Sequence, residues 1–180
     1  PWVHVWPSVS LAIFLTNGRD PPPTWSMSLG ELIQEDCVLL DIPETEKGDL
    51  IRCMVDALVR AGRVPEAGPV VQALLERERV MSTGIGGGVA IPHAQCPSVP
   101  ALAVALARPS LGVDFDSLDE KPVRLVFMIV GPEERGGFIR VLARISRLLY
   151  SGDLQGRLLE AKTPGDIRGI IHEEEEKLRG

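Results

Sequence analysis

The sequence predicts an α/β domain, a three-layer α/β/α sandwich with a mixed central sheet, and three observations support this fold class. Apolar runs of strand length alternate with segments whose apolar residues recur at helical spacing. The run at 123–130 is apolar for most of its length, as expected of a strand that helices cover on both faces. With 180 residues, of which 44% are hydrophobic and 24% charged, the chain suits one globular domain.

The start of the chain differs in composition from the rest, and we expect it to form a leader outside the domain. All three tryptophans lie before Met27, and prolines fill positions 21–23. A secretion signal is not indicated, because no basic region precedes the apolar run 9–15 and no Ala-x-Ala site follows it. We predict a disordered or non-native leader at 1–26 and one domain at 27–180, with a packed extension as the alternative.

The domain is predicted to open with a short apolar element at 29–33, a brief strand at 38–40 and then a helix. The helix is indicated by six apolar residues at helical spacing between 50 and 59, which form a stripe facing the core. Thr45 can cap its start and Gly62 its end, since hydroxyl side chains favour the helix N-cap and glycine favours the position after a helix.

A second helix is predicted to begin at Pro65 and to present the apolar residues of 70–75 on one face. It ends in the charged sequence Glu-Arg-Glu-Arg at 76–79, after which the character of the chain changes. Glycines and small residues fill most of 82–88, and an apolar run then leads to His93.

Strands and helices continue in the second half of the chain. The strands are predicted at 102–107 and 123–130, and the helices at 138–149 and 154–159. A last helix has a strong start signal at 163–166: a threonine cap, proline at the first helical position and an acid in the first turn. We expect its acidic end at 173–176 to be a solvated face or a frayed tail.

Charge and cysteine content disfavour several classes of function. The net charge of −6 disfavours nucleic acid as the main partner, because such binding requires Lys and Arg to neutralise phosphates. The sequence has no run of eighteen apolar residues, so we predict no membrane span. Cys37, Cys53 and Cys96 are odd in number and widely spaced, which argues against a disulfide framework and favours a reducing cytoplasm.

The glycine-rich segment 82–88 is the first candidate for chemistry. Packing alone does not explain it, since glycine costs about 1 kcal/mol relative to alanine inside regular structure. Such a loop lets backbone N–H groups converge on an anion. A P-loop is excluded because Val89 and Ala90 stand where Lys and Ser/Thr are needed. The dinucleotide fingerprint is excluded because it requires a strand before the glycines and a helix after them, the reverse of the order here.

His93 is the candidate nucleophile. It is the only histidine in the body of the predicted domain, since His4 lies in the leader and His172 in the acidic last helix. Pro92 removes a backbone donor, so we expect the strand to end there and to present the ring at a sheet end. A neutral imidazole, with an ordinary pKa of about 6.5, can accept a phosphoryl group directly. The alternative is a histidine whose ring is satisfied by a backbone carbonyl.

Arg77 is the candidate cation, because a transferred phosphoryl group adds up to about two negative charges. The alternative is a solvated arginine paired with Glu76 or Glu78. Zinc is not indicated: His93 and Cys96 are three residues apart, but no second ligand pair has a recognised spacing. A cysteine nucleophile is disfavoured too, since the domain body has no second histidine to activate a thiol.

The string from Arg77 to His93, Arg-Glu-x-x-x-Ser-Thr-Gly-Ile-Gly-x-Gly-Val-Ala-Ile-Pro-His, carries a family resemblance. It resembles the active-site signature of the type-2 (fructose/mannitol-type) EIIA domains of the bacterial phosphoenolpyruvate-dependent phosphotransferase system. Within that family it is most similar to the nitrogen-regulatory EIIA proteins. The likeness continues through 113–127, 131–134 and 158–163, and so covers the chain from Met27 onward.

The resemblance implies a cytoplasmic phosphocarrier, a phosphotransferase component with a phosphohistidine intermediate rather than a free-standing enzyme. His93 would accept a phosphoryl group from the phosphohistidine of an HPr-type protein, and in transport paralogues the group passes to a cysteine of an EIIB domain. No nucleotide, metal or other cofactor is required. Arg77 would stabilise the phosphoryl charge. The residues that would hold the phosphoryl oxygens are Ser82, Thr83, Gly84, Gly86, Gly87 and Gly88.

One position departs from the family pattern. The second family histidine aligns with Phe138, which cannot donate a hydrogen bond to phosphate. Either Arg135 or Arg140 compensates, or transfer is slower, or the domain mainly senses. Three functions therefore stay open. The nitrogen-type likeness favours a regulatory phosphocarrier with no EIIB module or membrane portion attached; the alternatives are the EIIA subunit of a sugar permease and a non-catalytic interaction module.

Overall fold

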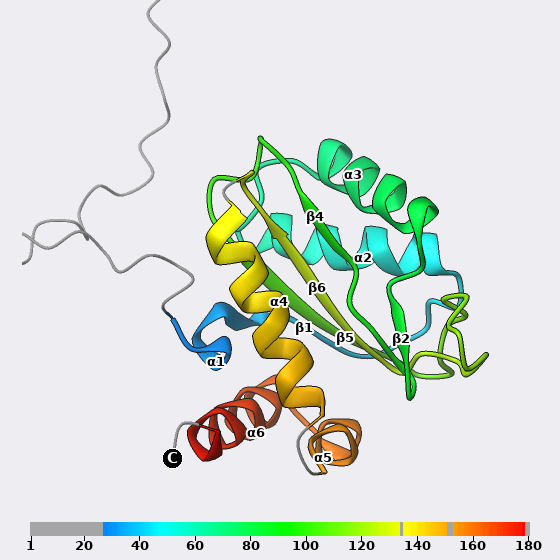
Figure 1. Ribbon diagram of the computed structural model, residues 1–180, viewed down its shortest axis with the longest axis vertical. Coiled ribbons are helices and arrows are strands. Elements are labelled where there is room, and N and C mark those ends of the chain that lie inside the picture. The colour runs from blue at the N-terminus through cyan, green and yellow to red at the C-terminus, as the bar shows by residue number, and fades with distance from the viewer. Residues whose placement is uncertain (1–26, 134, 151–152, 179–180) are drawn as a thin grey trace, which may run out of the picture.

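A mixed sheet forms the middle layer of the computed structural model, with helices on both of its faces (Figure 1). The structure describes residues 27–133, 135–150 and 153–178, and within these ranges the sheet has six strands. This arrangement confirms the predicted α/β/α fold, while the predicted leader at 1–26 lies outside the described residues. The strands are β1 (Ile33–Ile42), β2 (Gly84–Gly86), β3 (Val89–Ala90), β4 (His93–Gln95), β5 (Ala103–Pro109) and β6 (Leu125–Gly131).

Strands β5 and β6 lie at the centre of the sheet, whose order is β1-β5-β6-β3-β2, with β4 also beside β6. The sheet is mixed because β1 is parallel to β5, whereas β5 and β6 are antiparallel. Both β3 and β4 run parallel to β6, and β2 is antiparallel to β3. Every residue of β5 and β6 is buried, which confirms the strand predicted from the apolar run at 123–130.

Helices cover the two faces of the sheet unequally. Helices α2 and α3 pack on one face, and α1, α4, α5 and α6 lie on the other (Figure 1). Strand β6 contributes to both cores, because Phe127 packs on the α4 side and Met128 on the α2 side. The helices are α1 (Leu29–Leu32), α2 (Lys47–Arg60), α3 (Ala67–Val80), α4 (Arg135–Leu149), α5 (Leu154–Glu160) and α6 (Pro164–Lys177). None of the helices in these ranges is long and apolar enough to cross a membrane.

The ends of α2 and α3 agree only partly with the sequence signals. Gly62 follows α2 with φ +68°, the left-handed conformation that ends a helix, as predicted. The N-cap of α2 is Glu46 rather than Thr45, and α3 begins at Ala67 rather than Pro65. Neither N-cap side chain makes a capping hydrogen bond. Both helices instead pack their apolar stripes into one core, which supplies most of the stability of such helices.

The acidic end of α6 is not the solvated or frayed tail that its composition predicts. Glu174 and Glu175 are buried, and the carboxylate of Glu175 accepts the N–H groups of Leu29 (2.8 Å) and Gly30 (3.2 Å). The first N–H groups of a helix have no partner within that helix, and a negative charge there is favourable. Glu175 therefore attaches the short α1 to α6.

Strand β1 spans Ile33–Ile42 and is longer than the predicted 38–40. The sequence did not indicate its first half, because that half lacks an apolar pattern. Gln34, Glu35 and Asp36 are exposed, although they belong to the strand. An edge strand has one side without a partner, so polar residues are acceptable there. The pairing with β5 is also irregular between Ile33 and Val38.

Candidate functional site

The fold delivers His93 through a strand that is interrupted at Pro92 and then resumes. Ala90 lies opposite Val126 and His93 opposite Ile129, so the register along β6 is unchanged across the gap. Pro92 has no N–H, but its carbonyl still accepts the N–H of Ile129 at 3.0 Å. The strand of the apolar run therefore ends at Ala90, before Pro92, as expected, but His93 does not lie past the sheet, because it begins a further strand, β4, beside β6.

The imidazole of His93 has a defined tautomer because of its hydrogen bond. Nδ1 lies 2.7 Å from the carbonyl oxygen of Ile91. A carbonyl can only accept, so Nδ1 must carry the proton, and the lone pair of the neutral ring is on Nε2. The ring is thus bonded to a backbone carbonyl, as the alternative interpretation of His93 expects, but this bond leaves Nε2 available as a nucleophile.

Burial lowers the pKa of His93 below its usual 6.5 and is the main cause of the shift. The hydrogen bond to Ile91 acts in the opposite direction. The positive charge of Arg77 lowers the pKa further, and the negative charge of Glu78 raises it. The ring, which is half-buried, is therefore neutral at neutral pH, as nucleophilic attack requires.

His93 and Arg77 line one cleft of about 740 Å³. Helix α3 forms one wall through Arg77 and Val80, and the loop before α4 contributes Glu133. Phe138 of α4 closes another side, with its ring centroid 6.0 Å from that of His93 and the two planes at 54°. The structure thus brings together the predicted nucleophile and the predicted cation.

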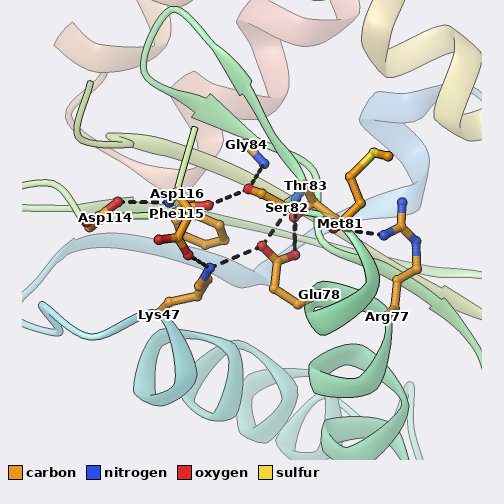
Figure 2. A network of polar contacts seen from close by, with 10 residues as sticks. All are labelled: Lys47, Arg77, Glu78, Met81, Ser82, Thr83, Gly84, Asp114, Phe115 and Asp116. Atoms are coloured by element: carbon orange, nitrogen blue, oxygen red, sulfur yellow. Dashed lines mark hydrogen bonds and ion pairs between the residues drawn. The ribbon is translucent and has the colours of Figure 1, made fainter. Parts of the chain in front are cut away.

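Arg77 is not the solvated partner of a neighbouring acid. Its Nη1 donates to the carbonyl of Met81 at 2.9 Å. Glu78 points away from it, toward Thr83 and Lys47 (Figure 2). Glu76, for its part, accepts a hydrogen bond from Gln72 at 2.9 Å. A guanidinium has five N–H donors, so this contact leaves donors for an anion in the cleft.

The structure does not place the glycine-rich loop in this cleft. The residues that line the cleft come from α3, β4, the loop before α4 and α4 itself, and include none of Ser82 to Gly88. The loop instead forms a hairpin of β2 and β3, in which Gly86, Gly87 and Gly88 have φ of +85°, +64° and +77°. Other residues rarely adopt such angles, so the hairpin accounts for these glycines.

Polar groups of the loop are already bonded inside the protein. The hydroxyl of Ser82 donates to the carbonyl of Phe115 and accepts the N–H of Gly84 at 3.0 Å (Figure 2). Gly87 donates its N–H to Asp119 at 2.8 Å, and this bond is the main reason that the pKa of Asp119 is lowered. Phosphate binding by this loop therefore stays a prediction.

Phe138, the residue that the sequence predicts at the position of the second family histidine, lines the cleft beside the ring of His93 and offers no hydrogen-bond donor. Of the two arginines proposed to compensate at the cleft, only Arg140 has a side chain that the structure describes. Arg140 is exposed on α4 and is not among the residues that line it. The side chain of Arg135 lies outside the described part of the chain.

Sequence reasoning missed Glu78, which it considered only as a surface partner of Arg77. Glu78 is buried, as are Val70 and Leu74 on the same helix. The three residues are spaced by four, so Glu78 continues the core-facing stripe of α3. This spacing is the signal in the sequence that could have identified it.

Comparison with known proteins assigns the chain to a family. Residues 31–174 match the family described as "Phosphoenolpyruvate-dependent sugar phosphotransferase system, EIIA 2". The chain therefore belongs to this family, and the predicted resemblance is confirmed.

Relatives with sugar-related and with nitrogen-related names reach the same identity, but the sugar-related match extends over more of this chain. A "PTS system fructose-specific EIIA component" of Haloferax volcanii is 37% identical over 139 residues, which are 77% of this chain and 90% of that protein. A "Nitrogen regulatory protein" of Bradyrhizobium diazoefficiens is 37% identical over 103 residues, or 57% of this chain and 67% of the relative.

Solved structures agree with the fold. The crystal structure of nitrogen regulatory protein IIA-Ntr from Neisseria meningitidis superposes with a TM-score of 0.71 at 30% identity, covering 79% of this chain and 97% of that one. IIA mannitol from Escherichia coli has a TM-score of 0.67 at 24% identity, covering 77% and 97%, and supports the fold alone.

Proposed function

We propose that this chain is a phosphocarrier that accepts a phosphoryl group on Nε2 of His93 from the phosphohistidine of an HPr-type protein. The observation that supports this most is the hydrogen bond from Nδ1 of His93 to Ile91, inside a cleft that also holds Arg77. It keeps the proton on Nδ1 and the lone pair on Nε2. Membership of a phosphotransferase-system family supports the same chemistry.

The geometry indicates how this transfer proceeds. The Nε2 lone pair attacks phosphorus while the P–N bond of the donor breaks, and the donor nitrogen keeps that electron pair. The ring of His93 becomes positively charged as the new P–N bond forms. The Ile91 carbonyl stabilises that charge because it accepts the Nδ1–H. Arg77 supplies positive charge for the phosphoryl oxygens, so positioning and charge stabilisation carry the step.

The phosphate-binding roles predicted for the loop need a rearrangement of existing bonds. Thr83, Gly84 and Gly87 donate their N–H groups to Glu78, Ser82 and Asp119. Gly86 and Gly88 lie in the same hairpin. We therefore assign the direct contacts with the phosphoryl group to Arg77 first, and to the loop only if its hairpin shifts on binding.

For the role of the phosphorylated protein we propose regulation of the nitrogen type, exerted through binding of other proteins in the cytoplasm. The nitrogen regulatory relatives and the IIA-Ntr structure support it, and the odd, widely spaced cysteines favour that compartment. Supply of a sugar permease through an EIIB domain is the second candidate. The fructose-specific name of the Haloferax relative favours it, and a similar fold was solved in the complex of enzyme IIAMTL with phosphorylated enzyme IIBMTL.

Incubation with labelled phosphoenolpyruvate, enzyme I and HPr tests the carrier function. We expect acid-labile label on the wild-type chain and on His172→Ala, and none on His93→Ala. Label that survives the His93 substitution would refute the site. A wild-type chain that takes no label would favour the non-catalytic module. Transfer of label onward to an EIIB domain would favour transport over regulation.

A further inference from the structure

Glu78 is a buried carboxylate beside Arg77, and the proposed transfer step assigns it no direct role. Its side chain is 5% exposed, and glutamate is almost never fully buried unless it is paired. It follows Arg77 in the last turns of α3, but the two side chains point in different directions (Figure 2). A buried carboxylate at such a position needs an explanation.

The partners of Glu78 come from two other segments. Its carboxylate accepts the N–H of Thr83 at 3.1 and 3.2 Å and the Thr83 hydroxyl at 2.7 Å. Lys47, in the first turn of α2, approaches it at 3.4 Å and reaches Asp116 at 2.5 Å (Figure 2). Charge-assisted hydrogen bonds of this kind are the stronger class. The main-chain position of Thr83 is therefore fixed from α3.

A continuous set of hydrogen bonds leads from Thr83 to the imidazole. The carbonyl of Thr83 accepts the N–H of Ile91 at 3.0 Å. The carbonyl of Ile91 accepts the Nδ1–H of His93 at 2.7 Å. Ile91 is 3% exposed and precedes Pro92, so its backbone has little freedom to move independently. Each residue in the series is held by the one before it.

We propose that Glu78 is a positioning residue for His93. By holding Thr83, it fixes the Ile91 carbonyl that orients the ring and keeps its proton on Nδ1. The same bonds attach the end of α3, which carries Arg77, to the strand that carries His93. Glu78 therefore sets both the tautomer of the nucleophile and its place relative to the cation. This inference rests on the proposed function only for its effect on rate.

The tautomer can be measured without phosphotransfer. In ¹⁵N-histidine-labelled, unphosphorylated protein, the ring nitrogen shifts of His93 report which nitrogen is protonated. We expect Nδ1–H in the wild-type chain and a mixture of tautomers in Glu78→Gln and Thr83→Val. Thr83→Ser keeps the hydroxyl and is expected to keep Nδ1–H. Asp49→Asn, at an exposed side chain in the first turn of α2, is the matched acid-to-amide control.

The effect on rate is measured in the phosphoryl transfer assay. A misplacement of about 1 Å can cost about 100-fold in rate, so we expect kcat to fall by up to about 100-fold in Glu78→Gln and Thr83→Val. KM for HPr is expected to stay the same, because neither residue lines the cleft.

The proposal is overturned if both variants, folded by circular dichroism, keep the Nδ1–H signal and the wild-type kcat. Thr83→Val retains the backbone hydrogen bond to Glu78, so it provides a folded variant if Glu78→Gln does not. Failure of the proposed function alone would give a different result. Neither the wild-type chain nor any variant would take label, but Glu78→Gln would still change the tautomer of His93.

Discussion

Replacement of Arg77 by alanine tests the electrostatic part of the proposed transfer. Arg77 shares the cleft with His93, and its Nη1 donates to the carbonyl of Met81. One charge-assisted hydrogen bond to the phosphoryl group contributes about 1.5–3 kcal/mol. At about 1.4 kcal/mol for each factor of ten, its loss lowers kcat for phosphoryl acceptance by about 10- to 150-fold. The kcat of Arg77→Lys is expected to lie between those of the wild-type chain and Arg77→Ala, because lysine keeps the positive charge but lacks the planar guanidinium.

Arg79→Ala is the matched control for this variant. Arg79 lies two residues further along α3 and lines a different hollow, next to Lys47 and Asp116. Both substitutions change the net charge equally, so steering of the donor protein is affected alike. The assay is single-turnover transfer from phosphorylated HPr, with kcat and KM determined separately. Equal losses of kcat in the two variants would refute a direct role of Arg77 at the phosphoryl group.

Three further predictions concern stability, pH and the cleft wall. Arg108 donates to the carbonyls of Leu158 and Ala161 at the end of α5, so Arg108→Met leaves buried acceptors unpaired. We expect a loss of about 3 kcal/mol in urea unfolding, and a loss below about 1 kcal/mol would contradict it. Burial lowers the pKa of His93, so the rate of phosphoryl transfer should stay constant near neutral pH and fall only as the pH drops through a value below 6.5, where the ring becomes protonated. A rate profile with its inflection above pH 6.5 would be inconsistent with this. Phe138→His introduces a hydrogen-bond donor beside His93 and is expected to raise kcat by about 2- to 10-fold. Phe138→Leu introduces no donor and is expected to leave kcat unchanged. Equal values of kcat in the two variants would count against a role for the donor.

The elements with a strong local signal were predictable from the sequence. Strand β6 is apolar throughout and lies where the run at 123–130 places it. Thr163 caps α6, as the start signal predicts, and Asp166 in the first turn adds a reciprocal bond to the N-cap. In both cases neighbouring residues determine the structure, so no knowledge of distant contacts is needed.

What the sequence did not show depends on contacts between distant segments. The burial of Glu175 follows from its bonds to α1, which lies at the other end of the chain. Glu78 was taken for a surface charge because its contacts with Thr83 and Lys47 are seen only in the structure. The pattern of glycines does not reveal that Gly86, Gly87 and Gly88 form a tight hairpin, and the anion-binding role of the segment stays a prediction. His93 and Arg77, the predicted nucleophile and cation, line the same cleft, and their roles stay a prediction.

The identity of the phosphorylated atom tests the central claim most directly. Wild-type chain labelled with ¹⁵N-histidine is phosphorylated by phosphoenolpyruvate, enzyme I and HPr and studied by NMR. The tautomer set by Ile91 predicts a ³¹P–¹⁵N coupling at Nε2 of His93, with Nδ1 uncoupled. A coupling at Nδ1, or at His172, would contradict the account.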